Sequence, residues 1–182
     1  NGSHGLDALL DIWNLIFGMA VLFLTRILGL LYIINNVEDE EIRANSRKTL
    51  AYPAVYFLVL FLLFVFRTLF KDGYAVNPET GVIFLEPMKY LNNLLEMWYV
   101  LLLFLVGVML VLYGIGDAIF RKTSTKSIWP AGIGTVLTVL SLLLLVGYNN
   151  TAFYPSNADL QSSLTIQNAS SSEFTLTAMA YV

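Results

Sequence analysis

Four long apolar stretches constrain this chain more than any other feature. They cover about residues 6–34, 49–70, 90–120 and 128–148. Each is long enough to cross about 30 Å of hydrocarbon as a helix that rises about 1.5 Å per residue. Of the 182 residues, 57% are hydrophobic and only 13% are charged, so a soluble domain of this length could not bury all its apolar surface. The sequence therefore predicts an all-α membrane protein with four transmembrane helices in one bundle.

The basic residues predict how these helices are oriented. Six Lys and Arg residues lie in the connections 35–48 and 121–126. The opposite side has two, Lys71 and Lys89. Because loops rich in Lys and Arg stay in the cytoplasm, this difference places both connections there. The N-terminus and the residues after 148 are then predicted outside.

Two polar segments are predicted on the outer side. The connection 71–89 is rich in turn-forming pairs and is expected to hold a small hairpin at about 75–84. The tail 149–173 is rich in Ser, Asn and Thr. After it the chain becomes apolar again, so residues 174–182 are expected to be the first turns of a further, truncated span.

The residue types that carry most enzyme chemistry are scarce. There is no cysteine, and His4 is the single histidine. Thiolate catalysis, zinc or iron–sulfur sites, histidine-ligated haem and a Ser–His–Asp relay are therefore not expected in this chain. A net charge of −3 also argues against nucleic-acid binding, which requires neutralisation of phosphates. We expect no catalytic, metal-binding or cofactor-binding residue here.

Two Gly-Ile-Gly sequences, at 114–116 and 132–134, resemble pieces of nucleotide-binding loops. They lie in apolar spans and lack the rest of that motif, which favours close helix packing instead. Gly107 and Gly114 are seven residues apart and share one helix face. We expect this face to let a neighbouring helix approach closely.

The acidic run 38–41 is a weaker candidate for a cation site. Consecutive acids on a helix point in different directions and do not converge on one ion. Asp39 and Arg43 have the i,i+4 spacing of a solvated helix that starts with acids. We therefore expect a solvated helix start.

Five charged residues fall near the ends of the predicted spans. Asp11, Arg67 and Glu96 are expected at the outer rim, and Arg26 and Asp117 at the inner rim. Charges are costly in hydrocarbon, so these side chains are expected to reach toward headgroups, or Arg67 to pair with Asp11 or Glu96. If Arg67 is paired, Leu in its place should destabilise more than replacing both partners together. No charged residue lies near the middle of the predicted spans, whereas an ion pathway is expected to place an ionisable residue at that depth.

Three stretches resemble one known family. Residues 163–172 read Ser-Leu-Thr-Ile-Gln-Asn-Ala-Ser-Ser-Ser, and with 174–179 they are similar to the segment before the last helix of cytochrome bd quinol oxidase subunit II. Residues 5–14 and 73–82 are similar to weaker motifs in the second half of that family. Subunit II has about twice this length and eight helices. The resemblance implies that the four spans are its fourth to seventh helices and that the eighth is missing.

The resemblance also implies a function. The complex would be a terminal oxidase of the prokaryotic respiratory chain, in the plasma membrane, that oxidises quinol and reduces oxygen to water. In the family the haems and the quinol site belong to the partner, subunit I, so this chain would be haem-free and structural. Its contacts would be subunit I, membrane lipids and, as a further candidate, quinone. Asn168, Ser170, Ser171 and Ser172 are then expected to cap backbone groups in the turn before the last helix.

A different class of protein is also compatible with these residues. The sequences Asn-Asn-Thr at 149–151 and Asn-Ala-Ser at 168–170 are N-glycosylation sequons. They fit a self-standing tetraspan binding protein with an external recognition tail. A transporter fits less well, because the centre of the spans holds no charge. Haem absorbance that co-purifies with the chain would favour the oxidase, whereas glycan mass without haem would favour the tetraspan protein.

Overall fold

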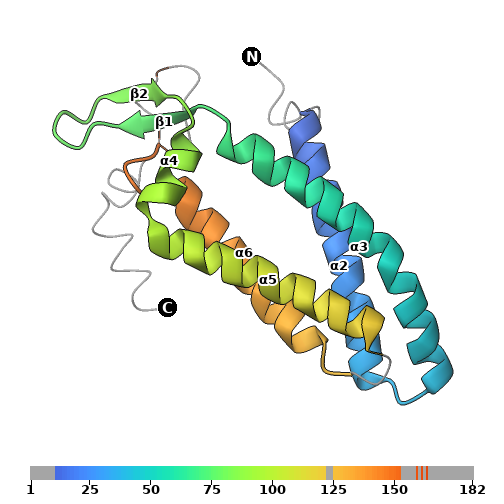
Figure 1. Ribbon diagram of the computed structural model, residues 1–182. Coiled ribbons are helices and arrows are strands. Elements are labelled where there is room, and N and C mark those ends of the chain that lie inside the picture. The colour runs from blue at the N-terminus through green and yellow to red at the C-terminus, as the bar shows by residue number, and fades with distance from the viewer. Residues whose placement is uncertain (1–10, 122–124, 153–158, 160, 162, 164–182) are drawn as a thin grey trace, which may run out of the picture. The chain divides into compact units, whose positions relative to one another are not determined.

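The computed structural model describes residues 11–121, 125–152, 159, 161 and 163 (Figure 1). In chain order its elements are α2 Ile12–Asn36, α3 Glu40–Leu69, β1 Gly73–Val76, β2 Ile83–Glu86, α4 Lys89–Glu96, α5 Trp98–Phe120 and α6 Ile128–Gly147. Among the described helices, α2, α3, α5 and α6 are long and apolar enough to cross a membrane. The predicted all-α membrane fold with four spans is confirmed.

Two compact units make up the fold, and α5 and α6 run through both. The first unit is formed by residues 1–68 and 103–139, and the second by residues 69–102 and 140–182. The first unit therefore holds α2, nearly all of α3, the end of α5 and the start of α6. The second holds the β-hairpin, α4 and the remaining turns of α5 and α6.

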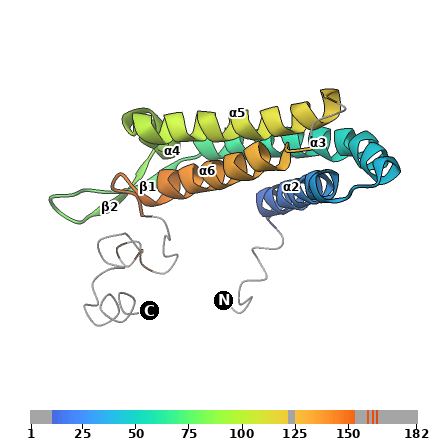
Figure 2. The same cartoon turned by 90° about the horizontal axis from the view of Figure 1, so that it is seen from below.

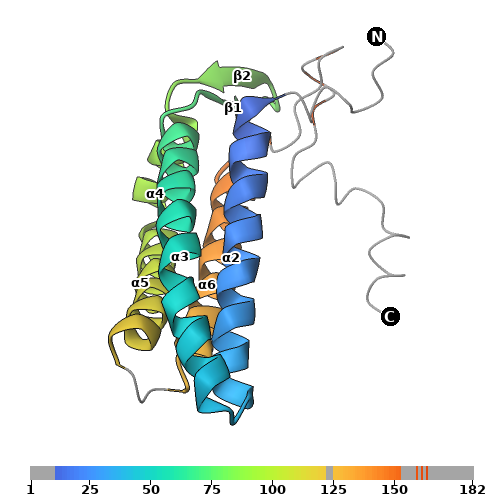
Figure 3. The same cartoon turned by 90° about the vertical axis from the view of Figure 1, so that its right-hand side faces the viewer.

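In the first unit, α2 and α3 run antiparallel and side by side (Figure 3). Aromatic rings connect them. Phe17 stacks on Phe64 with ring centroids 4.4 Å apart, and Phe23 stacks on Tyr56 at 5.3 Å. Such pairs contribute about 0.5–1.5 kcal/mol beyond the area they bury. These two contacts fix which residues of α2 lie beside which residues of α3 on the two sides of the turn 37–39.

α3 begins at Glu40, well before the predicted span 49–70, so most of the predicted connection 35–48 is helical. The Asp39 carboxylate accepts hydrogen bonds from the backbone N–H groups of Glu41 and Ile42, at 2.8 and 3.1 Å, and so caps the helix. Arg43 pairs with Glu40 rather than with Asp39. The acidic run is thus a helix start, as expected. Hydropathy could not detect this part of the helix because its turns are polar.

The predicted third span, 90–120, consists of two helices. The chain leaves helical geometry at Met97, with φ −92° and ψ 66°, so that α4 ends before it and α5 begins after it. Lys89 and Asn93 are among the buried residues of α4. A helix with this buried polar face requires protein partners rather than hydrocarbon. The other two spans lie close to their predicted ranges.

The predicted hairpin at 75–84 is formed by β1 and β2. The strands pair antiparallel, with Val76 opposite Ile83. In the turn, the Asn77 side-chain oxygen accepts hydrogen bonds from the backbone N–H groups of Glu79 and Thr80. Gly81 has a φ of 69°, in the left-handed region that favours glycine.

The segment after α6 adds to this small sheet. Thr151 forms an antiparallel bridge with Ala75. The Val76 N–H donates to the Asn150 carbonyl at 2.7 Å, and the Ala152 N–H donates to the Tyr74 carbonyl at 2.8 Å. The hairpin therefore fixes where the chain goes after it leaves the last described span.

α5 and α6 lie side by side (Figures 1 and 2) and approach closely along a seam of small residues. We call this the α5–α6 seam; it comprises Gly107, Gly114, Ala131, Gly134 and Thr138. A Cβ on Gly134 would lie 2.6 Å from the Gly107 carbonyl oxygen, and one on Gly114 would lie 2.8 Å from the Ala131 nitrogen. The predicted close approach at Gly107 and Gly114 is confirmed. Gly132 does not take part, because a Cβ there would meet nothing within 4 Å.

Candidate functional site

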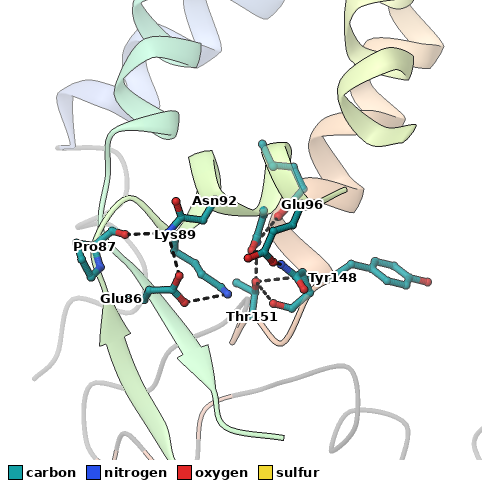
Figure 4. Close-up of polar contacts among 10 residues, drawn as sticks. Glu86, Pro87, Lys89, Asn92, Glu96, Tyr148 and Thr151 are labelled. Atoms are coloured by element: carbon teal, nitrogen blue, oxygen red, sulfur yellow. Dashed lines mark hydrogen bonds and ion pairs between the residues drawn. The ribbon is translucent and has the colours of Figure 1, made fainter. Parts of the chain in front are cut away.

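A polar network joins α4 to the end of α6 and to the segment that follows it (Figure 4). Asn93 is fully buried, at 0% exposure. Its Nδ2 donates to the Leu145 carbonyl at 3.1 Å and to the Thr151 hydroxyl at 2.8 Å. Its Oδ1 accepts from the Asn149 side-chain amide at 3.0 Å. Both polar atoms of the side chain are therefore satisfied, as burial requires.

This network completes the C-terminus of α6. The last four carbonyls of a helix have no partner within the helix. Asn93 provides one for Leu145, close to the helix end at Gly147. Asn149 and Asn150 then adopt left-handed backbone angles, with φ 58° and 52°. Asparagine tolerates this region better than most residues, so the chain can turn here toward β1.

The same contacts bear on the sequon at 149–151. The Asn149 Nδ2, the atom to which an N-linked glycan would be attached, also donates to the carboxylate of Glu96. Thr151 is almost completely buried, and its hydroxyl donates to the Tyr148 carbonyl at 2.7 Å. A glycan on Asn149 would have to break this network, which argues against the tetraspan reading. The second sequon lies outside the described residues.

An ion pair links the hairpin to α4. The Lys89 Nζ lies 3.0 Å from the Glu86 carboxylate, and the two side chains are 7% and 26% exposed. Asn92 donates to the other carboxylate oxygen at 3.0 Å. Gly73 packs against Lys89, and a Cβ on it would lie 2.8 Å from the Lys89 Cβ. Burial by itself would raise the pKa of Glu86, but the hydrogen bonds from Asn92 and Lys89 and the charge of Lys89 outweigh it, and the pKa is lowered.

Acidification is expected to weaken this link. Because the pKa of Glu86 is lowered from 4.5, its ionised form adds stability that is fully present above 4.5 and is lost as pH falls through the lowered value. Glu86→Gln keeps the shape and removes the charge. Thermal unfolding of the purified complex should therefore differ between wild type and this variant near neutral pH, and the difference should shrink as the pH falls below 4.5 and through the lowered pKa of Glu86. A difference that does not change with pH would contradict this role.

Arg67 lies over the ring of Trp13, with its guanidinium carbon 5.5 Å from the ring centroid. Asp11 does something else: its carboxylate accepts a hydrogen bond from the Trp13 N–H at 2.8 Å and caps α2. Across the described residues no ion pair joins Arg67 to Asp11. The predicted pairing of these two residues is therefore replaced by a cation–π contact. Glu96, the other predicted partner, is the acceptor for Asn149.

This contact can be measured by a double-mutant cycle. Arg67→Leu and Trp13→Leu should each destabilise the complex, and the two losses should not add. We expect a coupling free energy of about 0.5–1 kcal/mol, typical of a cation over an indole ring. Asp11→Ala is the control, because its loss of a helix cap should add independently to that of Arg67→Leu. A coupling that is stronger with Asp11 than with Trp13 would restore the ion-pair prediction.

A second set of interacting polar side chains lies in the first unit, at the end where α5 leads into α6. Asp117 accepts a hydrogen bond from the Ser127 hydroxyl at 2.7 Å and lies 3.6 Å from the Nε of Arg121. Arg47 of α3 donates from Nη1 to the Arg121 carbonyl at 2.9 Å. The two basic connections, predicted on one side of the membrane, therefore meet at one end of the first unit.

Arg26 is exposed on α2. Phe23, one turn before it, contacts Tyr52 and Tyr56 with centroids 6.4 and 5.3 Å away. Arg26 therefore lies at the level where the apolar part of α3 begins, near Thr49. From this level a long side chain can reach the headgroups.

The predicted capping residues of the tail, Asn168, Ser170, Ser171 and Ser172, lie outside the described residues, and so does the segment 174–182. Gln161 is a described residue of the tail. Its side chain accepts from the Ile83 N–H at 3.1 Å and donates to the Ile83 carbonyl at 3.3 Å. It therefore binds the backbone of β2 much as a neighbouring strand would.

Sequence reasoning missed Asn93, Lys89 and Glu86 as structural residues. One signal was present: Asn92, Asn93 and Glu96 stand close together within a stretch predicted to cross the membrane. Three such residues are unfavourable in hydrocarbon, and they could have placed the start of the span after them.

The polar groups at the ends of the spans bond to one another and hold helix ends together. Within residues 11–121 and 125–152, no three His, Cys, Asp or Glu side chains come together as a metal site.

A family profile of cytochrome bd terminal oxidase subunit II matches residues 2–182. The matched range includes all four spans, the hairpin and the stretches 5–14, 73–82 and 163–172. A search among curated proteins finds no match. The resemblance inferred from the motifs is confirmed by the profile. The chain therefore belongs to the cytochrome bd terminal oxidase subunit II family and is a multi-pass membrane subunit of a bd-type terminal oxidase.

Proposed function

We propose that this chain is the haem-free subunit of a quinol oxidase and that it holds the membrane helices of the complex in place. Membership of this family implies that the chain forms a complex with a partner oxidase subunit. In the proposed complex that partner is subunit I, which carries the haems and the quinol site. The complex oxidises quinol and reduces oxygen to water. The exposed faces of the spans meet subunit I, membrane lipids and, as a further candidate, quinone.

The structural role is supported by where the polar side chains of the spans make their bonds. Asn93 and Asp117 bond to other parts of the same chain at helix ends. The α5–α6 seam brings two spans into backbone contact between these ends. At the middle levels of the described spans, near Val59, Val106 and Thr138, no charged side chain occurs. Such a subunit positions and packs the membrane helices of the complex, while electron transfer takes place in its partner.

The proposed location is the plasma membrane of a prokaryote, with the hairpin outside and the basic connections in the cytoplasm. This orientation follows from the six basic residues of the two connections against the two of the other side. The contact between Arg47 and Arg121 is consistent with it, because it brings both connections to one end of the first unit.

The function is tested by purifying the complex from native membranes through an affinity tag on the full-length subunit. We expect a haem-bearing polypeptide to co-purify, with visible absorbance and quinol-dependent oxygen consumption. After the two subunits are separated under non-denaturing conditions, the haem absorbance should stay with the partner. A preparation without haem and without oxygen consumption would contradict the proposal. Haem that remains with this chain alone would contradict its haem-free role.

Orientation can be tested separately because the chain contains no cysteine. Single cysteines at Thr80, in the hairpin turn, and at Glu41, at the start of α3, both replace exposed residues. A membrane-impermeant maleimide should label Thr80→Cys in intact cells and Glu41→Cys only after permeabilisation. The reverse pattern would invert the proposed topology and would leave the oxidase function untouched.

A further inference from the structure

We infer that the basic end of the first unit, where α5 leads into α6, binds the phosphate of an anionic phospholipid. Three cations from separate parts of the chain belong to this end: Arg47 of α3, Arg121 directly after α5, and Lys126 two residues before α6. We call them the basic triad. The inference requires that the helices cross a membrane and does not depend on the proposed catalytic activity.

Geometry links the three segments. Arg47 donates from Nη1 to the Arg121 carbonyl at 2.9 Å. Asp117 joins the two sides of the α5–α6 connection, since it lies 3.6 Å from the Arg121 Nε and accepts from the Ser127 hydroxyl, next to Lys126. The Arg121 side chain is 71% exposed. These contacts bring the Arg47 guanidinium to Arg121 and tie Ser127, the residue after Lys126, to the same helix end.

The local charge favours an anion. The basic triad carries three positive charges and Asp117 one negative charge, which leaves +2. The acids 38–41 lie about two turns away at the start of α3, and Glu40 there is paired with Arg43. The N-terminus of α6, at Ile128, adds the partial positive charge of a helix start. Arginine also presents a planar fork of N–H donors that matches phosphate oxygens.

The position of the triad favours a lipid phosphate over a phosphate ion in solution. Arg121 directly follows the last residue of one span, and Lys126 stands two residues before the first residue of the next. Two large apolar side chains lie at these span ends and are exposed: Phe120 at 84% and Trp129 at 65%. Cations at the water boundary, next to exposed apolar rings, fit a headgroup and the start of its acyl chains.

The test uses the purified oxidase complex with its full-length subunit. After delipidation, phosphatidylglycerol is added and its retention is measured by native mass spectrometry, with phosphatidylcholine as the zwitterionic comparison. We expect Arg121→Gln and Arg47→Gln each to weaken retention of phosphatidylglycerol about fivefold, as removal of one basic residue near the surface should. Lys71→Gln, which removes an exposed cation from the second unit, is the matched control and should retain lipid like wild type.

Four results can contradict the inference. Arg47→Lys keeps the charge and should retain more lipid than Arg47→Gln; equal losses would contradict a role for the charge of Arg47. Equal retention of phosphatidylcholine would overturn the preference for an anionic headgroup. Displacement of the lipid by inorganic phosphate at comparable concentration would identify a free-anion site and overturn the lipid assignment. Retention that is unchanged in both glutamine variants would refute the site.

Discussion

Alanine at Gly134 should destabilise the oxidase complex, whereas alanine at Gly132, two residues earlier on α6, should be tolerated. A Cβ on Gly134 would lie 2.6 Å from the Gly107 carbonyl oxygen and 2.7 Å from the Val111 nitrogen. Both are backbone atoms, so no side-chain rotation can relieve the overlap, and α5 and α6 must separate. Overpacking of this kind costs about 1–3 kcal/mol, and in a membrane there is little hydrophobic gain between helices to offset it.

Gly132→Ala is a matched control because it makes the same chemical change on the same helix. Its Cβ would meet nothing within 4 Å. Each variant complex is extracted and its thermal unfolding and the yield of assembled oxidase are compared with wild type. We expect a clear loss for Gly134→Ala and a larger one for Gly134→Val. If Gly132→Ala is as damaging as Gly134→Ala, steric overlap in the α5–α6 seam does not determine the effect.

Alanine at Asn93 should loosen the second unit. The substitution removes three hydrogen bonds and leaves the Leu145 carbonyl and the side chains of Asn149 and Thr151 without this partner. Each buried polar group that loses its partner costs about 1–3 kcal/mol. We therefore expect a loss of about 3 kcal/mol and release of the segment that Thr151 attaches to β1.

A single cysteine at Ala152 reports this release directly. Ala152 is 2% exposed, and its N–H is bonded to Tyr74 of β1. Maleimide should label this thiol slowly in the otherwise wild-type complex and much faster when Asn93→Ala is added. Asn92→Ala, which removes the half-buried neighbour bonded to Glu86, is the control and should change labelling much less. Labelling that stays slow in the Asn93 variant would show that the segment is held by other contacts.

Much of the architecture could be predicted because it depends on neighbours in sequence. The spans follow from runs of apolar residues, whose transfer into hydrocarbon is favourable wherever the rest of the chain lies. Gly107 and Gly114 predicted a close helix contact because their spacing places both on one helix face. The hairpin followed from turn residues around Asn77 and Gly81, since backbone angles there are a local property.

Helix boundaries and site contacts were predicted less well. The sequence places Asp39 at a helix start, but the first turns of the helix that follows are polar, so hydropathy assigns them to a connection. For Arg67 the sequence leaves open a side chain that reaches toward headgroups or one that pairs with a carboxylate, and in the structure it lies over Trp13. In both places the sequence shows which polar groups need a partner. It does not show which partner they contact, because several residues of the chain would be suitable.

The sequence by itself determined that the chain has four membrane spans and which helix face carries the small residues that allow close packing. Only the tertiary structure decided that Asn93 and Lys89 are buried and that the chain after α6 joins the hairpin. The free energy of a buried polar group depends on whether a partner is present. The Leu145 carbonyl is brought to Asn93 by folding, across a separation of 52 residues, and no local pattern contains that information.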